Sequence, residues 1–368
     1  MPLLDTGQAN IHSHEVNYRV LHSFARHHDG YHPFAGLLSA GTELYGTTSA
    51  GGSSDVVGGC GAVYELTTSH LESVLYSFQC APDGEYPTDT LINLNGTLYG
   101  TTEGGGVYAK GSVFALTKSG KERVLYSFQG YNDASVPSGG LIAVNGKLYG
   151  TTARGGNYGQ GTVFVVTTSG KERLVHSFGG SGDGAGPSAG LIAVKGVLYG
   201  TTGGGGANNS GTVFRVKTGR EKVLYSFKGF PDGASPQSEL TESAGELYGT
   251  TGSGGNYNEG AVFKVSTSGV EHVFYSFGTQ HYDGQGPSSP VTVMNGTFYG
   301  LTGAGGTQQG GVLFGIAASG KEQILHNFGL ASDGAYPNGR LIVVGKALLG
   351  TTQYGGKHGI GTVFALWP

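Results

Sequence analysis

A five-residue phrase, LYGTT or a close variant, recurs along the whole chain and restricts the possible folds more than any other feature. Its glycine stands at seven positions: Gly46, Gly100, Gly150, Gly200, Gly249, Gly300 and Gly350. Successive copies are therefore 54, 50, 50, 49, 51 and 50 residues apart. A regular period of about 50 residues is typical of propellers, solenoids and other repeat arrays.

One copy of the repeat, residues 137–178, contains four segments with the composition of β-strands. GLIAV and LYGTT are joined through Asn-Gly, the strongest short-range signal for a β-hairpin. After a glycine loop come GTVFVV and ERLVHSF, which a TSG turn separates. Four antiparallel strands in each of seven repeats predict an all-β fold, a seven-bladed β-propeller. An open solenoid is disfavoured because no polar end repeats are visible in the sequence.

The two ends of the sequence predict how the ring closes. The chain ends on GTVFALWP, which matches the third strand of a repeat without the fourth, and VNYRVLHSF near the start matches a fourth strand alone. We expect residues 16–24 to complete the last blade, which removes the open sheet edges. Residues 16–368 are then one propeller domain, preceded by a tail of residues 1–15.

The composition excludes several classes of partner. The chain has 72 glycines, 12% charged residues and a formal net charge of -4, so it lacks the basic face of a nucleic-acid-binding protein. No apolar run approaches the roughly 20 residues that span a bilayer. Residues 1–15 lack the charged and apolar regions of a signal peptide. This leaves an intracellular protein, or one whose leader has been removed.

The repeated pattern LYGTT…GG…GTVF…SG…LYSF…DG…P resembles the Gloeo/Verruco (GloVer) tandem repeat over essentially all of residues 16–368. The resemblance implies a propeller and a secreted or otherwise extracytoplasmic setting. It implies no activity, since propellers with this architecture include lectins, lyases, hydrolases and scaffolds.

Every connection between blades, here called a crossing loop, carries an aspartate at one position. The seven are Asp29, Asp83, Asp133, Asp183, Asp232, Asp283 and Asp333. They could form a calcium-binding or acid–base array, or each could cap a turn by accepting backbone hydrogen bonds. Occurrence in every blade favours the turn.

Residues that depart from the repeat are the better candidates for function, because the blade itself does not require them. The departures are Arg26, His28, Tyr31, His32, Tyr86, His281, Tyr282 and Tyr336 in crossing loops, Glu239 and Arg340 just before inner strands, and Arg154, Tyr354 and His358 in the glycine loops after LYGTT. Both loop types are expected on one face, around the mouth of the central channel.

From these residues we predict one asymmetric ligand site. Histidine exchanges protons near neutral pH, tyrosine donates a hydrogen bond or a proton, and arginine holds an anion. The predicted catalytic residues are His32, His281, Tyr31 and Glu239, and the predicted substrate-binding residues are Arg26, His28, Tyr86, Tyr282, Tyr336, Arg340, Arg154, Tyr354 and His358. The competing interpretation is that the tyrosines pack on neighbouring loops and that Glu239 and Arg340 are solvated rim charges.

The predicted function is acid–base catalysis of the lyase or cyclase type, such as elimination, dehydration or pericyclic cyclisation. The sequence lacks a nucleophile elbow or a phosphate-binding loop, which argues against ordinary hydrolysis and phosphoryl transfer. Propeller hetero-Diels–Alderases of fungal secondary metabolism and propeller polysaccharide lyases are similar by analogy only. The alternatives are a lectin-like carbohydrate-binding propeller, an extracellular polysaccharide lyase, or a scaffold. The predicted partner is a small-molecule or glycan ligand, and the oligomeric state stays open.

We predict no cofactor and no metal. His28 and His32 have i, i+4 spacing, but this spacing aligns imidazoles only on a helix, and these two belong to a turn.

The two cysteines predict a disulfide. Cys60 precedes the third strand of blade 1, and Cys80 follows the fourth. Folding the hairpin about its turn places residue 60 opposite residue 79, within reach of a cross-strand bond. The alternative is two buried free thiols. A disulfide favours an oxidising, extracytoplasmic compartment.

Overall fold

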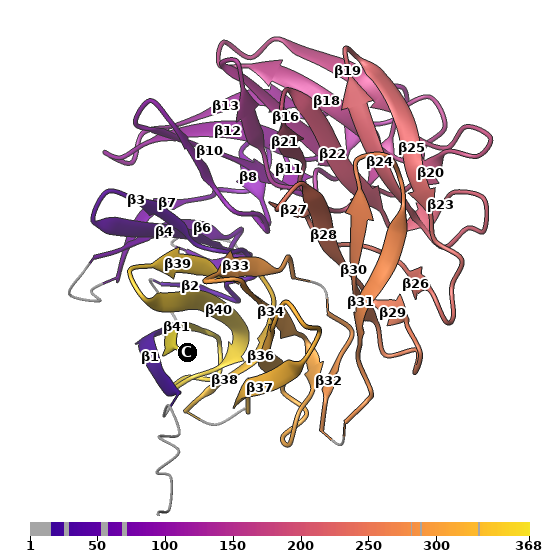
Figure 1. Cartoon of the computed structure of the whole chain (residues 1–368). Helices are drawn as coiled ribbons and strands as arrows, with labels where there is room; N and C mark the ends of the chain where they lie inside the picture. Colours follow the sequence, from indigo (N-terminus) through magenta and orange to yellow (C-terminus); the bar gives the residue numbers. More distant parts are fainter. Residues whose placement is uncertain are drawn as a thin grey trace, which may run out of the picture.

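The computed structural model of the chain describes residues 16–25, 29–52, 58–67, 72–280, 282–287, 289–329 and 332–368. Within these ranges every regular element is a β-strand, and seven antiparallel sheets stand around a central axis as the blades of a propeller (Figure 1). The predicted all-β, seven-bladed fold is confirmed. The predicted tail, residues 1–15, lies outside the described residues.

Each blade has four strands, which follow the chain from the channel outward in blades 1 to 6, whereas blade 7 takes its outermost strand from the start of the chain. The strands are β3 (Leu38–Ala40), β4 (Glu43–Thr48), β6 (Ala62–Leu66) and β7 (Glu72–Ser77) in blade 1; β9 (Ile92–Leu94), β10 (Thr97–Thr102), β12 (Ser112–Thr117) and β13 (Glu122–Ser127) in blade 2; β15 (Ile142–Val144), β16 (Lys147–Thr152), β18 (Thr162–Thr167) and β19 (Glu172–Ser177) in blade 3; β21 (Ile192–Val194), β22 (Val197–Thr202), β24 (Thr212–Lys217) and β25 (Arg220–Ser226) in blade 4; β27 (Thr241–Ser243), β28 (Glu246–Thr251), β30 (Ala261–Ser266) and β31 (Glu271–Ser276) in blade 5; β33 (Thr292–Met294), β34 (Thr297–Thr302), β36 (Val312–Ile316) and β37 (Glu322–Asn327) in blade 6; and β39 (Ile342–Val344), β40 (Ala347–Gly355), β41 (Thr362–Trp367) and β1 (Asn17–Ser23) in blade 7.

Short two-stranded ribbons connect each crossing loop to the glycine loop of the blade that follows it. The pairs are β2 (Gly30–Tyr31) with β5 (Ala50–Gly51), β8 (Gly84–Glu85) with β11 (Gly104–Gly105), β14 (Ala134–Ser135) with β17 (Arg154–Gly155), β20 (Gly184–Ala185) with β23 (Gly204–Gly205), β26 (Gly233–Ala234) with β29 (Ser253–Gly254), β32 (Gly284–Gln285) with β35 (Ala304–Gly305), and β38 (Gly334–Pro337) with the end of β40. These pairings place both loop types on the same face of the propeller.

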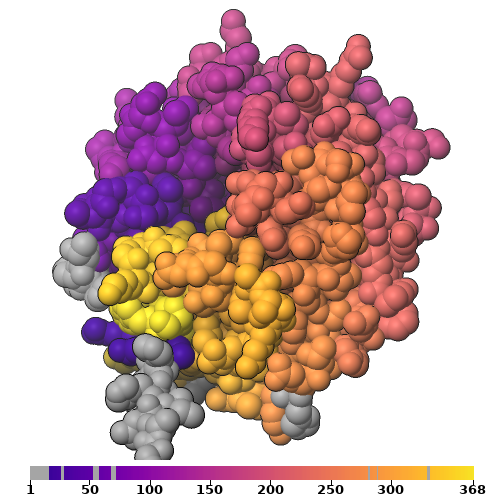
Figure 2. All heavy atoms as spheres, viewed as in Figure 1, coloured from indigo at the N-terminus to yellow at the C-terminus, as the bar shows by residue number. Residues whose placement is uncertain are grey.

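The ring closes as the sequence predicts. β1 pairs with β41 in antiparallel register from Asn17 opposite Trp367 to Ser23 opposite Thr362. Figure 2 shows the indigo N-terminal strand against the yellow C-terminal segment. Because the first strand completes the last blade, the sheet edges at the two ends of the chain are covered.

An aromatic pair fills each interface between blades. Phe78, at the start of a crossing loop, meets Phe114 of the following blade edge to face, with ring centroids 5.1 Å apart, and both side chains are fully buried. The glycine of LYGTT makes room for this ring, since a Cβ at Gly100 would lie 2.6 Å from Cζ of Phe114. Burying one such ring stabilises the fold by about 1.5–3 kcal/mol. The seven pairs are Phe24–Tyr64, Phe78–Phe114, Phe128–Phe164, Phe178–Phe214, Phe227–Phe263, Phe277–Phe314 and Phe328–Phe364.

The repeated aspartate caps its crossing loop, as the turn interpretation predicts. Oδ2 of Asp83 accepts hydrogen bonds from the Gln79 amide at 2.9 Å and the Tyr76 hydroxyl at 2.8 Å, and Oδ1 accepts from the Gly84 amide at 2.7 Å. In blade 3 a histidine replaces the tyrosine, and His176 Nε2 lies 2.9 Å from Oδ2 of Asp183. These carboxylates belong to the structure of the blades.

A glutamate from the next blade faces each of six aspartates. In the most buried case, burial and the nearby Asp283 carboxylate raise the pKa of Glu322 to about 7, and Gln280 donates a 3.1 Å hydrogen bond to its Oε2. Burial likewise raises the pKa of Glu72 to about 8, and those of Glu122, Glu172, Glu221 and Glu271 to about 7. At the seventh interface the corresponding residue is Tyr18, whose ring stacks on His326 at 3.7 Å.

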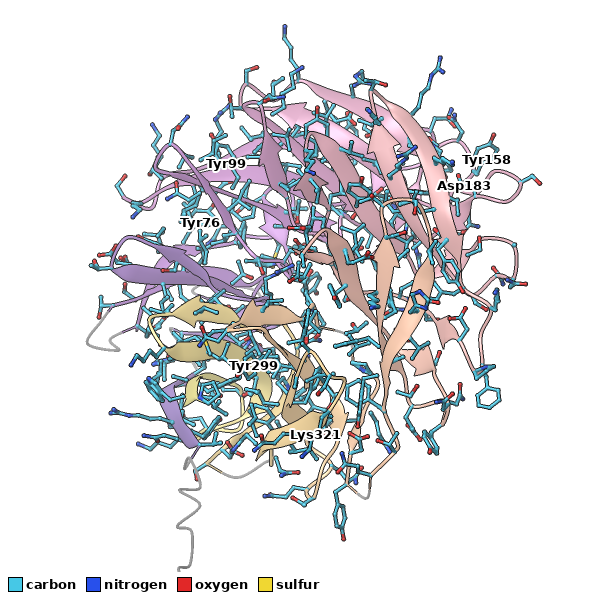
Figure 3. The ribbon with its side chains drawn as sticks, in the orientation of Figure 1. Tyr76, Tyr99, Tyr158, Asp183, Tyr299 and Lys321 are labelled. Carbon is cyan, nitrogen blue, oxygen red and sulfur yellow. A yellow bond between two sulfur atoms is a disulfide. The ribbon has the colours of Figure 1, made fainter. Side chains whose placement is uncertain are left out.

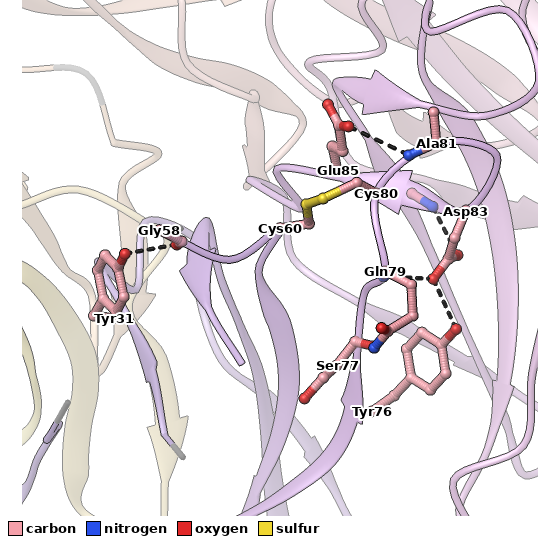
Figure 4. The surroundings of a disulfide bond; sticks show 11 residues. Tyr31, Gly58, Cys60, Tyr76, Ser77, Gln79, Cys80, Ala81, Asp83 and Glu85 are labelled. Carbon is pink, nitrogen blue, oxygen red and sulfur yellow. Dashed lines mark hydrogen bonds between the residues drawn. A yellow bond between two sulfur atoms is a disulfide. The ribbon is translucent and has the colours of Figure 1, made fainter. Parts of the chain in front are cut away.

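The predicted disulfide is present. Cys60 and Cys80 are bonded, with Cα atoms 5.4 Å apart (Figure 4). The bond joins the end of the blade 1 glycine loop to the start of the next crossing loop. A hydrogen bond of 3.0 Å from the Tyr86 amide to the Cys60 carbonyl connects the same two loops. Both partners therefore lie at the loop face that carries the predicted ligand site.

Candidate functional site

Exposed aromatic side chains gather on the loop face. Among the described residues, all of them except Trp367 belong to crossing or glycine loops. They are Tyr86, Tyr108, Tyr131, Tyr158, Phe230, Tyr257, Tyr282, Tyr336 and Tyr354. Figure 3 shows one of them, Tyr158, at the outer edge beside Asp183. Exposed tyrosine offers a flat apolar surface with a polar end, which suits binding of organic or sugar ligands.

One residue with left-handed backbone stands directly before the proline of every crossing loop, and these seven positions are here called the rim. They are His32, Tyr86, Val136, Gly186, Ser235, Gly286 and Tyr336, with φ between 53° and 61°. Backbone hydrogen bonds hold each of these residues in place. The His32 amide, for example, donates to the Ile360 carbonyl in the glycine loop of blade 7, and the His32 carbonyl accepts from the Ser49 amide in the glycine loop of blade 1. The three large aromatic members come from consecutive crossing loops, which lead into blades 7, 1 and 2. The rim is therefore asymmetric, with an aromatic wall on one side.

The wall is a connected set of rings. The His32 ring lies 4.6 Å from that of Tyr354 and 5.1 Å from that of Tyr31, and Tyr354 lies 5.7 Å from Tyr336. Nδ1 of His32 is 3.0 Å from the Gln353 carbonyl. The Tyr31 hydroxyl donates a 2.6 Å hydrogen bond to the Gly58 carbonyl (Figure 4). Tyr31 therefore supports the wall from outside, with its proton directed at the protein.

Below the rim, the channel contains a cavity of about 330 Å³ to which all seven blades contribute. On blades 3, 4 and 6 its described lining is Ser138, Gly140, Ser188, Ala189, Gly190, Ser289 and Pro290. The ionisable groups come from elsewhere: Asp89 and Glu103 from blade 2, Glu239 from blade 5 and Arg340 from blade 7. The charges are thus spread around the ring on blades 2, 5 and 7, and the lining from the other blades is neutral.

Glu239 and Arg340 form an ion pair across the channel. Arg340 Nη2 lies 3.2 Å from Glu239 Oε1 and donates to the Leu240 carbonyl at 3.3 Å. Both residues also line a second cavity of about 550 Å³, together with β21 and β27. The pair therefore separates the upper cavity from the lower one. Its partners include backbone groups, so it is more than a pair of solvated rim charges.

Asp89 is a site residue that the sequence prediction missed. Its Oδ2 is buried and has no hydrogen-bond partner among the described residues, while the Gly140 amide donates to the carboxyl group. Burial, Glu103 and Glu239 raise its pKa well above the ordinary value. Burial also raises the pKa of Glu103, whose Oε1 accepts a 2.8 Å hydrogen bond from Thr88. Burial and the neighbouring carboxyl groups therefore disfavour ionisation of Asp89.

The sequence did contain a signal for both residues. Where blade 2 has Asp89, the other blades have Ala35, Gly139, Ala189, Ser238, Ser289 and Gly339. Where it has Glu103, they have Ser49, Ala153, Gly203, Gly252, Gly303 and Gln353. Both are charged departures at positions that are otherwise small or neutral.

The other predicted site residues divide by location. His32, Tyr336 and Tyr354 meet at the rim, and Glu239 and Arg340 lie in the channel below. Tyr86 is exposed on the adjacent part of the rim. Arg154 is exposed on β17, His358 is exposed in the loop between β40 and β41, and Tyr282 lines a separate outer cavity, so the described channel lining includes none of these three. Arg26, His28 and His281 lie outside the described residues.

Among the described residues, three groups of side chains have potential metal-ligand atoms within 4.8 Å of one another: Cys60, Cys80 and Glu85; His22, Asp29 and Glu72; and His176, Asp183 and Glu221. The first contains the disulfide, whose sulfurs are not free thiolates. The other two repeat the contact that tyrosine makes with aspartate in blades 1, 2, 4 and 5. They are therefore explained by the blade interface.

The repeat pattern of the chain matches a known protein family. The model of the Gloeobacter/Verrucomicrobia repeat matches residues 9–152 and 138–364, which together cover most of the sequence. The chain belongs to the Gloeobacter/Verrucomicrobia repeat family. The resemblance in the repeat pattern is thus confirmed. No curated protein matches this Gloeobacter/Verrucomicrobia repeat protein in sequence.

Solved structures similar to this Gloeobacter/Verrucomicrobia repeat protein share its fold at low sequence identity. A putative 6-phosphogluconolactonase from Bacteroides uniformis has a TM-score of 0.55 and 15% identity, over 85% of this chain and 90% of the other. A puromycin-hydrolyzing peptidase from Mycobacterium tuberculosis has 0.53 and 11%, over 89% of this chain and 52% of the other. The propeller domain of the Trilobed protease from Pyrococcus furiosus has 0.50 and 6%, over 90% and 93%. The chain spans about half of the peptidase.

The described part of the chain contains no helix that could cross a membrane.

Proposed function

We propose that the upper channel cavity is the active site of an enzyme that performs acid–base chemistry of the lyase or cyclase type on a small organic molecule. The observation that carries the proposal is the Asp89 carboxyl group: burial raises its pKa, and its buried Oδ2 has no hydrogen-bond partner among the described residues. A carboxyl group whose ionisation is disfavoured by burial can donate a proton to a leaving group.

Glu103 supplies the complementary base. Two carboxyl groups that share a site are driven into different protonation states, because the charge of one disfavours ionisation of the other. In an elimination, ionised Glu103 takes a proton from carbon, a C=C bond forms, and Asp89 protonates the departing hydroxyl, which leaves as water. A proton then returns from Glu103 to Asp89 through solvent.

The remaining residues position the substrate. Arg340 and Glu239 line the cavity, and we expect His32, Tyr336 and Tyr354, whose rings contact one another in the adjoining loops, to hold the apolar part of the substrate. A cavity of about 330 Å³ is at the small end of the usual range for ligand pockets. Since Glu239 already neutralises Arg340, a neutral or cationic substrate is favoured over an anionic one. A shaped wall that holds one reactive geometry is also what a pericyclic cyclisation requires.

The disulfide supports an extracytoplasmic location for this enzyme, since such bonds persist in oxidising compartments.

The experiment is to incubate the protein with a small-molecule extract and follow, by mass spectrometry, compounds that lose one water or isomerise. Asp89→Asn keeps the shape of the side chain but removes the acid, and should slow product formation about 10²–10⁴-fold. Tyr158→Phe, at the outer edge, is the matched control and should leave the rate unchanged. Equal rates in Asp89→Asn, Glu103→Gln and the unmodified protein would refute the assignment.

A further inference from the structure

A third cavity, separate from the two in the channel, lies at the outer part of the loop face, between blades 5 and 6. Its volume is about 460 Å³, and its lining includes Tyr257, Glu259, Gln280, Tyr282, Gln285 and Gln309. It shares no described lining residue with the channel cavity. It is therefore a separate site, away from the residues proposed for catalysis.

This cavity is built by the one crossing loop that departs in length. Ten positions separate Phe277 from Pro287, against nine between the corresponding residues of every other crossing loop. The longer loop carries Tyr282, which adopts a left-handed backbone with φ of 65°. The loop is also fixed to its neighbour, because the Gly286 amide donates a 2.9 Å hydrogen bond to the Glu259 carbonyl.

The polar side of the cavity is anchored from below. Gln280 donates from Nε2 to Oε2 of Glu322, and Glu322 is only 6% exposed. Asp283, 4% exposed, accepts from the Gly278 amide at 2.9 Å and so holds the start of the loop. These buried carboxyl groups hold the Gln280 side chain and the Gly278 amide before a ligand arrives, which reduces the entropy cost of binding.

The chemistry of the lining indicates a neutral sugar. Tyr257 and Tyr282 are about half exposed and present aromatic surface, and three glutamine amides can both donate to and accept from hydroxyl groups. The described lining contains no lysine or arginine, the residues that recognise phosphate and carboxylate groups. Glu259 disfavours an anionic ligand by charge repulsion.

We propose that this outer cavity binds a neutral sugar residue of a glycan. The site holds the protein on a carbohydrate while the channel stays open to its own substrate. It does not depend on the proposed catalytic function, since no group in it contributes to the channel.

The test uses an array of immobilised neutral and uronic-acid oligosaccharides, probed with the fluorescently labelled full chain. Binding to at least one neutral glycan is expected, with an affinity loss of about tenfold or more in Tyr257→Ala and in Gln280→Ala. Tyr158→Ala is the matched control, because Tyr158 occupies the same glycine-loop position in blade 3, and it should bind normally. Free glucose, galactose and mannose as competitors distinguish a single sugar from a glycan chain.

Three outcomes would overturn the proposal. These are no neutral glycan bound by the unmodified chain, equal binding by Tyr257→Ala and Gln280→Ala, or a preference for acidic glycans. A loss in Tyr158→Ala as large as in Tyr257→Ala would also contradict it, since the site would then be a repeated one. Circular dichroism of each variant shows whether the propeller is intact. Asp89→Asn should bind glycans normally, which separates this site from the channel.

Discussion

Replacing Glu322 by glutamine should make the protein more stable at alkaline pH. Glu322 is 6% exposed, and burial and Asp283 raise its pKa from 4.5 to about 7. A group with a raised folded-state pKa contributes its full stability below the unfolded value, near 4.5, and loses it as the pH rises through 7. The pKa difference corresponds to about 3 kcal/mol of unfolding free energy at pH 8.

Glu322→Gln keeps the shape and remains neutral at every pH. Its amide oxygen can accept the hydrogen bond from Gln280, and its amide nitrogen can donate toward Asp283. The variant should therefore match the unmodified protein at pH 4.5 and exceed its unfolding free energy by up to about 3 kcal/mol at pH 8. The assay is urea unfolding, followed by tyrosine fluorescence and circular dichroism, at pH 4.5, 6, 7 and 8.

Glu246→Gln, at the start of β28 on the opposite face, is the control. Its difference in unfolding free energy from the unmodified protein should stay the same between pH 4.5 and pH 8. The reasoning is refuted if Glu322→Gln and the unmodified protein differ by the same amount at pH 4.5 and pH 8, or if the variant is the less stable of the two at pH 8. The other five interface glutamates are more exposed, so solvent screening reduces the effect of each. Together they should still make the unmodified protein lose stability between pH 5 and 8.

Three more predictions follow from the same structure. Tyr18→Glu places a carboxyl group beside Asp333 at the closing interface, and should steepen the loss of stability between pH 5 and 8 in urea unfolding; an unchanged pH slope would contradict the proximity of these groups. The double variant Cys60→Ser with Cys80→Ser opens a cross-link between residues 20 apart and should lower the unfolding free energy by about 3 kcal/mol, an effect that reductant should reproduce in the unmodified protein but not in the variant. Arg340→Ala leaves Glu239 without its ion-pair partner beside Asp89, and should cost about 1–2 kcal/mol at low salt and less at high salt, which screens the pair; a loss independent of salt would indicate packing alone.

The fold could be predicted from the sequence because the repeat carries it. The period, the Asn-Gly hairpins and the split last blade determine the number of blades, the strands and the closure between β1 and β41. Asp83 and its equivalents were assigned to turns because they recur, and their hydrogen bonds confirm this. The cysteine pair followed from hairpin register alone, which is a local property of two adjacent strands.

The site was less predictable because it depends on how far each residue lies from the channel axis. Tyr282 and His32 both belong to crossing loops, but one lines an outer cavity and the other the rim. The direction of the Tyr31 hydroxyl was also not predictable from the sequence, since it is set by the hydrogen bond to the Gly58 carbonyl. Asp89 was overlooked because its role depends on its surroundings: on Glu103 of the same blade and on Glu239, which the fold brings near it from blade 5.

The most direct test of the account is a crystal structure of the protein with a small molecule captured from extract. We expect one ligand per chain in the upper channel cavity, with a polar group within hydrogen-bond distance of Asp89 Oδ2 and an apolar part against His32 and Tyr354. Equivalent ligands in all seven blades, with the channel empty, would contradict it.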